Sequence, residues 1–226
     1  MASVGSHPVH KTPLSRQNDG FSPKRRSAMK LFDSTRPLRR FAATLLAGAF
    51  CLVSFAGAAK FTGGRPVDPQ PDAGTLKAGL AVTYFFRYFD HIDELDGLSG
   101  GEAGEPIEQL DHVAFEDGKV LTTDRPMGVG AHIRGFIHLE SVGEYTFKLQ
   151  SNDGVKLSVG GIQMHADPEI HAARWSPDMT YEVSSPGWYD FTLDYYQRKG
   201  TSALRLKWVR PDGEEEIVPP VSFAHP

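Results

Sequence analysis

The stretch with the clearest chemical potential is a polar corner, Ser151-Asn152-Asp153-Gly154. Amide and carboxylate oxygens such as those of Asn152 and Asp153 are the ligands that Ca²⁺ takes in proteins, and they also accept hydrogen bonds from sugar hydroxyls. An Asp-Gly pair is equally good turn chemistry, because the aspartate caps nearby backbone N–H groups and glycine tolerates unusual dihedral angles. The corner therefore has two interpretations, a site for a ligand and a cation or a simple turn.

Trp175, in the segment "ARWSPD", is the second candidate ligand residue. An indole ring in a loop can face a ligand and stack on the apolar face of a sugar ring. The alternative is that Trp175 packs into the core. Together these residues give the predicted ligand-binding set of Asn152, Asp153 and Trp175, with Asn152 and Asp153 as candidate metal ligands.

The elements that flank the corner have the pattern of β-strands. In "EYTFKL" the residues Tyr145, Phe147 and Leu149 alternate with polar residues, and "VKLSV", "WYDFTLDYY" and "ALRLKWV" alternate in the same way. Period two predicts half-buried strands, because successive side chains of a strand face opposite sides of the sheet. Gly160-Gly161 predicts a two-residue hairpin. Many short strands with tight turns predict an all-β fold, an antiparallel sandwich or barrel.

The N-terminal part of the chain is typical of an export signal. A basic stretch precedes the apolar run Phe41 to Ala59, which is short for a membrane span and ends in small residues. Residues 29–58 are therefore predicted to be a signal peptide cleaved near Ala58, with an uncleaved anchor as the alternative. Residues 1–28 are predicted to be a leader without structural value. Cleavage leaves no stable transmembrane span.

The rest of the chain divides into a linker and one domain. Residues 59–78 are rich in Pro and Gly without an apolar period, so they are predicted to be a linker, and residues 79–223 form the domain. Residues 1–58 hold 9 of the 24 Lys and Arg and 2 of the 28 Asp and Glu, so 15 basic and 26 acidic residues remain, a net charge of −11. This charge excludes nucleic acid as a partner.

Neither thiol nor hydrolytic chemistry is indicated. Cys51 is the only cysteine and lies in the predicted signal peptide. The sequence contains no nucleophile elbow, no zinc-binding helix motif, no P-loop and no dinucleotide fingerprint. The chain is therefore predicted not to be an enzyme.

The ordered set of these segments resembles the PA14 domain family over residues 79–223. The similar features are the Gly135-Phe136-Ile137 strand, the Tyr145-Thr146-Phe147 strand, the Ser-x-Asp-Gly-Val corner, the Tyr195-Tyr196 pair and the Ile217-Val218-Pro219 ending. The resemblance implies a β-sandwich of barrel-like shape that serves as a binding or spacer module without catalysis.

In the lectin members of that family, two consecutive aspartates joined by a cis peptide hold Ca²⁺, and the ion binds sugar hydroxyls. Asn152 and Asp153 stand at those positions here. Asn152 removes one negative charge, so a weaker affinity for Ca²⁺ is expected. Gly160 is a second departure, since many relatives have aspartate there.

The resulting expectation is an exported module, periplasmic or secreted, that binds carbohydrate with Ca²⁺ as an implied cofactor. Its partner would be a glycan or another component of the cell envelope. The alternative is a protein-interaction or structural module of the envelope without a glycan ligand. The sequence identifies neither the glycan nor the oligomeric state.

Overall fold

The chain forms two β-sheets. The computed structural model describes residues 58–115 and 117–226, and the predicted leader and nearly all of the predicted signal peptide lie outside these residues. Among the described residues, no helix is long and apolar enough to cross a membrane. The all-β fold predicted from the alternating segments is confirmed.

The first sheet has seven strands in the order β1-β11-β7-β13-β14, with β10 also paired to β7 and β5 also paired to β13. All these pairs are antiparallel except the parallel pair of β1 and β11. The bounds are β1 (Ala59–Phe61), β5 (Asp111–Ala114), β7 (Gly143–Asn152), β10 (Arg174–Trp175), β11 (Met179–Val183), β13 (Ser202–Val209) and β14 (Glu215–Ile217).

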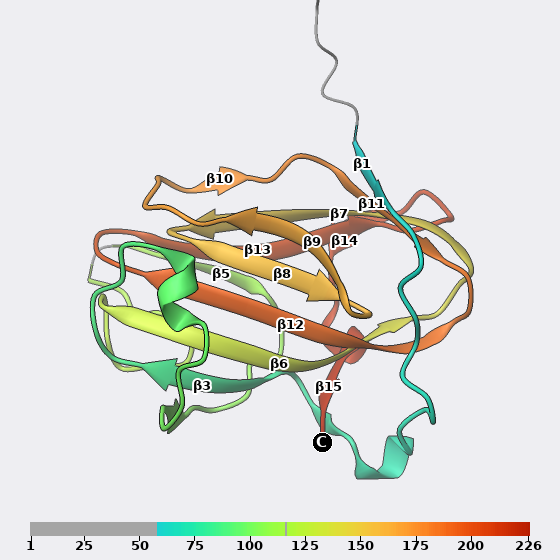
Figure 1. Cartoon of the computed structure of the whole chain (residues 1–226), viewed down its shortest axis with the longest axis horizontal. Coiled ribbons are helices and arrows are strands. Elements are labelled where there is room, and N and C mark those ends of the chain that lie inside the picture. The colour runs from blue at the N-terminus through green and yellow to red at the C-terminus, as the bar shows by residue number, and fades with distance from the viewer. Residues whose placement is uncertain (1–57, 116) are drawn as a thin grey trace, which may run out of the picture. The chain divides into compact units, whose positions relative to one another are not determined.

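The second sheet has eight strands in the order β2-β15-β6-β12-β8-β9, with β3 paired to β6 and to β4. In Figure 1 its strands β3, β6, β12, β8 and β9 lie in front of β7 and β13. The bounds are β2 (Lys77–Ala78), β3 (Ala81–Phe85), β4 (Glu102–Ala103), β6 (Val129–Leu139), β8 (Val155–Val159), β9 (Ile162–Asp167), β12 (Gly187–Gln197) and β15 (Phe223–His225). The 3₁₀ turns are η1 (Ala73–Thr75), η2 (Ile92–Leu95) and η3 (Pro220–Ser222).

The core lies between the sheets and is filled by the alternating apolar residues of both. Tyr181 of β11 meets Tyr189 of β12 edge to face, with 6.0 Å between ring centroids, so an aromatic pair joins the two layers. Phe147 and Trp208 continue this cluster within the first sheet, 6.0 Å apart. Such offset and perpendicular aromatic contacts add to the free energy of burial. Most polar residues of the long strands face outward, as the period predicts, while buried polar residues such as Ser151, Gln197 and Ser202 lie near strand ends.

The hairpin between β8 and β9 turns at Gly160 and Gly161, as predicted. Both glycines have positive φ, +56° and +80°. A two-residue hairpin turn with positive φ at both positions favours glycine, since other residues are strained there.

Residues 59–78 differ from the predicted linker, because they are part of the fold. They contain β1, η1 and β2, and the backbone N–H of Val67 donates to the Trp188 carbonyl at 2.8 Å. The Gln70 side chain accepts the Trp188 N–H at 2.7 Å. This segment binds the sheets mainly through backbone groups, which leave no apolar period in the sequence.

Gly64 makes the closest contact between this segment and the core. It is buried, and an added Cβ would lie 1.7 Å from the Tyr181 hydroxyl oxygen. Gly74, in the same segment, has open space, since its nearest neighbour would be an Asp72 carboxylate oxygen at 3.5 Å. Only the first position requires glycine for packing.

Gly64→Ala should lower the free energy of unfolding by about 1–3 kcal/mol, because the methyl group overlaps the packed Tyr181 ring. Gly74→Ala is the matched control and should leave stability unchanged or raise it by about 0.4–1 kcal/mol. Urea denaturation of the two variants measures both effects. Equal, small changes would mean that the segment is a free linker after all.

Candidate functional site

The predicted corner is the tight connection between β7 and β8. The peptide bond between Asn152 and Asp153 is cis, as in the aspartate pair that the family resemblance implies. The Asp153 N–H donates to the Tyr196 carbonyl at 3.1 Å, and the Gly154 carbonyl accepts the Tyr196 N–H at 3.0 Å. A Cβ on Gly154 would lie 2.3 Å from the Tyr196 ring, so glycine is needed for this approach. The corner is therefore fixed against the end of β12.

The Asp153 side chain is turned inward. It is 3% exposed, and its two carboxylate oxygens accept backbone N–H groups from His171 at 3.2 Å and Arg198 at 2.8 Å. Burial raises the pKa of the Asp153 carboxyl above its ordinary value, and these two N–H groups offset the effect only in part. The carboxylate thus joins the corner to two other loops, which is the arrangement that the turn interpretation expects.

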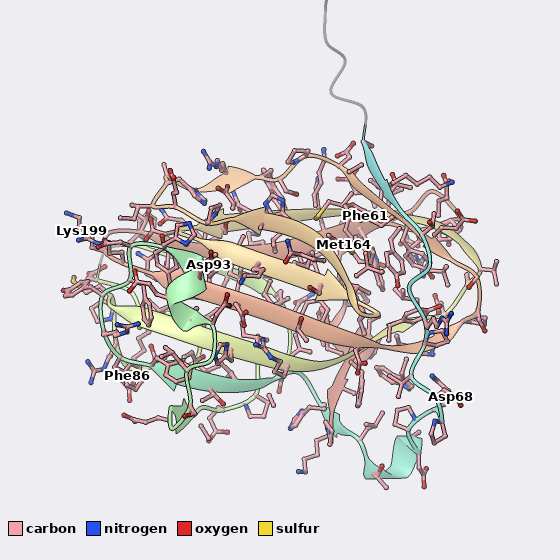
Figure 2. The ribbon with its side chains drawn as sticks, in the orientation of Figure 1. Phe61, Asp68, Phe86, Asp93, Met164 and Lys199 are labelled. Carbon is pink, nitrogen blue, oxygen red and sulfur yellow. The ribbon has the colours of Figure 1, made fainter. Side chains whose placement is uncertain are left out.

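Asn152 is also nearly buried, at 7% exposure. Its backbone carbonyl accepts the Tyr195 hydroxyl at 2.6 Å, and its side-chain N–H donates to the Thr201 hydroxyl at 3.3 Å. Burial raises the pKa of Tyr195 well above its ordinary value, so this hydroxyl stays protonated and donates. Asn152 therefore ties the corner to the loop that follows β12. Lys199, labelled at the left of Figure 2, marks the end of the sandwich where this loop lies.

The loop that Asp153 holds at His171 leads directly into β10. Arg174 is anchored by two hydrogen bonds to the Asp167 carboxylate, at 2.8 and 2.6 Å. The next residue, Trp175, pairs with Gln150 of β7, two positions before Asn152. The structure thus brings all three predicted site residues to one end of the first sheet, with the loop that Asp153 holds at His171 lying between Asp153 and Trp175 in the chain.

Trp175 lies outside the core. It is 36% exposed, and its ring has the Arg205 guanidinium carbon 5.7 Å and the Lys207 ammonium nitrogen 5.1 Å from its centroid. Gln150 pairs with Trp175 on one side and with Arg205 on the other, so the three residues form a row across β10, β7 and β13. An aromatic face with hydrogen-bond donors beside it is suited to a polar ligand that also has an apolar face. This outward position favours the ligand interpretation over core packing.

Arg205, Lys207 and Gln150 were not predicted as site residues. The alternation of "ALRLKWV" and "TFKLQ" already indicates that they face outward. Their proximity to Trp175 depends on the pairing of β13 and β10 with β7, and no local signal in the sequence specifies that pairing.

The corner offers few metal ligands. Among residues 58–115 and 117–226, no group of three or more His, Cys, Asp or Glu side chains is arranged to hold a metal ion. The single carboxylate of the corner, that of Asp153, already accepts two backbone N–H groups. One of these donors belongs to the basic residue Arg198, and Lys199 is the next residue in the sequence. Since Ca²⁺ takes six to eight oxygen ligands, the residues present do not fit a tight calcium site.

The comparisons with known proteins agree with this fold. A family model for the PA14 domain matches residues 76–222, which confirms the resemblance. No curated protein sequence matches the chain.

Several solved structures share the architecture. The PA14 domain of the MpAFP antifreeze protein is similar with a TM-score of 0.57 and 17% identity, over 71% of this chain and 96% of that one. The PA14 sugar-binding domain of an RTX adhesin gives a TM-score of 0.52 at 15% identity, over 66% of this chain and 99% of that one. The A domain of epithelial adhesin 9 from Candida glabrata, in complex with Galβ1-4GlcNAc, gives a TM-score of 0.52 at 13% identity, over 68% of this chain and 90% of that one. At these identities the similarity shows a shared fold.

The contributions of Asp153 and Asp167 to the free energy of unfolding should change with pH in opposite directions. The Asp153 pKa is raised above the ordinary value of 3.8, so its contribution to stability is greatest below that value and declines as the pH rises through the folded-state pKa. The hydrogen bond from Arg174 lowers the Asp167 pKa, so its contribution is present above 3.8 and is lost as the pH falls.

Accordingly, the stability advantage of the wild type over Asp153→Asn, which does not titrate, should be greatest near pH 4 and should shrink toward pH 7, because ionisation of the buried carboxyl costs stability. The advantage over Asp167→Asn should instead grow as the pH rises through the lowered folded-state pKa of Asp167 and should level off above the ordinary value of 3.8. Urea denaturation across this range measures both. Slopes of the same sign would contradict the two environments described above.

Proposed function

Because the chain belongs to the PA14 domain family, we propose that it is an exported, non-catalytic module that binds carbohydrate. Two similar structures support the ligand class, the PA14 sugar-binding domain of an RTX adhesin and the epithelial adhesin domain in complex with Galβ1-4GlcNAc. The basic and apolar N-terminal sequence supports export to the periplasm or beyond the cell.

The observation that carries this proposal is the exposed indole of Trp175 beside the corner. A sugar ring presents C–H groups on one face and hydroxyls around its rim, so it can stack on the indole while its hydroxyls meet polar side chains. Gln150, Arg205 and Lys207 provide those polar groups within the same area. Positive charges on this surface are balanced by ion pairs, so the surface suits a neutral sugar. The pairs are Arg205 with Asp111, Lys207 with Glu215 and Lys148 with Asp178.

We assign Asn152 and Asp153 to this site as positioning residues. The Asp153 carboxylate fixes the loop that ends at Trp175, and Asn152 fixes the corner beside it. Direct hydrogen bonds from a ligand to Asp153 would compete with the two backbone N–H groups that it already accepts. Its contribution to binding is therefore indirect.

Calcium, in this proposal, is at most a weak ligand of the corner. Asp153 supplies one carboxylate and Asn152 one amide oxygen, fewer charged ligands than a tight site needs. Sugar binding on Trp175 does not require the ion.

The competing proposal is a protein-interaction or structural module of the cell envelope. The inward Asp153 carboxylate favours it, because a purely structural corner needs no ligand. The exposed Trp175 favours carbohydrate, because a structural tryptophan would be expected in the core.

Trp175→Ala should reduce carbohydrate binding by roughly tenfold or more, a loss of about 1.4 kcal/mol, because the stacking face is removed. A glycan array probed with the purified wild-type protein identifies the ligand, and calorimetry with that ligand compares the variants. Phe115→Ala is the matched control, since Phe115 is an aromatic side chain 81% exposed, just after the end of β5. An array without any positive glycan would leave the envelope module as the better proposal.

Titration of the purified protein with Ca²⁺ should show no binding tighter than about 10⁻³ M, because the corner offers one carboxylate. Carbohydrate binding should likewise be unchanged by EDTA. A dissociation constant below roughly 10⁻⁵ M that disappears in Asp153→Ala would show that a true calcium site forms at the corner.

A further inference from the structure

A groove with a mainly apolar lining and several polar side chains lies on the outer face of the eight-stranded sheet, away from the corner. It has a volume of about 410 Å³, and its lining includes Arg134 and Phe136 of β6, Asp190 and Thr192 of β12 and Ser158 of β8. Phe136 pairs with Asp190 and Arg134 with Thr192, so these side chains form two adjacent rows across the sheet. None of them belongs to the site around Trp175.

The groove lies on the open part of this face. At one end η2 packs on β6 and β12, and Asp96, directly after η2, accepts a hydrogen bond from Lys156 of β8 at 2.7 Å. At the other end the N-terminal segment bonds to the start of β12 and to the β8–β9 turn through Val67 and Arg65. Figure 2 shows this face from the front, with Asp93 of η2 toward its left and Asp68 of the N-terminal segment at its right.

The polar groups of the groove differ in how they are held. Arg134 donates to the carbonyls of Ile133 and Leu193, at 2.9 and 3.1 Å, and its guanidinium also meets the Asp194 carboxylate at 2.5 Å. This guanidinium is therefore fixed in place. Asp190 is exposed, and within the described part of the chain no side chain or backbone N–H donates to its carboxylate. A fixed donor and a free acceptor thus lie on adjacent rows.

These features select the kind of ligand. The strands of the floor, β6, β12 and β8, each have partners on both sides, so no open edge exists there for an extended peptide to join. Arg134 is balanced by Asp194, and Asp190 is a single negative charge, so no strong field favours a polyanion. Two hydroxyls, a carboxylate and a guanidinium beside a half-buried phenyl ring match a neutral, hydroxyl-rich molecule with an apolar face.

We propose that the groove over Arg134, Phe136 and Asp190 is a second carbohydrate-binding surface, which holds a neutral oligosaccharide against the face of the eight-stranded sheet. The inference rests on the proposed function for its ligand class but not on Trp175. The phenyl ring of Phe136 contacts the apolar face of one sugar ring, and Asp190, Thr192 and Ser158 bind its hydroxyls, while Arg134 borders the groove.

Two surfaces on opposite sheets make a single chain bivalent. Trp175 lies on the outer side of the seven-stranded sheet and Phe136 on the outer side of the eight-stranded sheet. Two weak sites on one rigid domain can engage two glycan chains, or two parts of one long chain, with a higher overall avidity than either site alone.

The test uses calorimetry with a panel of neutral hexasaccharides of glucose, galactose and N-acetylglucosamine. The wild type should bind at two sites, and Trp175→Ala should retain one. In the Trp175→Ala background, Asp190→Ala and Phe136→Ala should each weaken the remaining site by roughly tenfold or more, equivalent to about 1.4 kcal/mol. Phe115→Ala in the same background should change nothing. Asp190 is exposed, so its variant retains the fold even if Phe136→Ala lowers the melting temperature.

The outcomes separate the two proposals. Loss of all binding in Trp175→Ala, or residual binding that neither groove variant affects, overturns the second surface and leaves the first intact. Binding that Trp175→Ala leaves unchanged and Asp190→Ala abolishes supports the groove and contradicts the role of Trp175. A wild type that binds no member of the panel overturns both.

Discussion

One buried carboxylate determines how the loops at the end of the sandwich are arranged. Asp153 accepts backbone N–H groups from two segments far apart in the sequence, at His171 and Arg198, while its own N–H is bound by β12. A buried, charged acceptor with two donors is tolerated because each oxygen has a partner, and its raised pKa records the desolvation that remains. The loop held at His171 continues into β10, where the pairing of Trp175 with Gln150 of β7 fixes the position of Trp175.

Under the proposed function, the corner combines the two interpretations that the sequence left open. It is a structural turn in the sense that its polar groups are satisfied within the protein. In the proposed function it also serves recognition, since the loop that Asp153 holds at His171 leads to the exposed ring of Trp175. A site built in this way needs no ion for its organisation, which separates it from a corner in which two carboxylates must be neutralised.

Much of the fold could be predicted from the sequence, because the apolar residues of "EYTFKL" and "WYDFTLDYY" repeat at the period of a half-buried strand. The Gly160-Gly161 hairpin was equally predictable from its turn chemistry. The N-terminal segment was misjudged, because Val67 and Arg65 attach it through backbone groups and Gly64 fits by having no side chain at all. Of the site, Asn152, Asp153 and Trp175 could be selected by residue type. The inward direction of the Asp153 carboxylate could not, since it depends on donors supplied by distant loops.

The parallel pair of β1 and β11 has a consequence for how the molecule behaves in solution. β1 covers the outer edge of β11 along Ala59, Lys60 and Phe61, at a border of the seven-stranded sheet. An uncovered border strand presents unpaired N–H and C=O groups to which a second copy can add, and this is a common route to aggregation. Proteolysis that removes these three residues would therefore leave the outer edge of β11 unpaired and prone to aggregation, while the core stays in place.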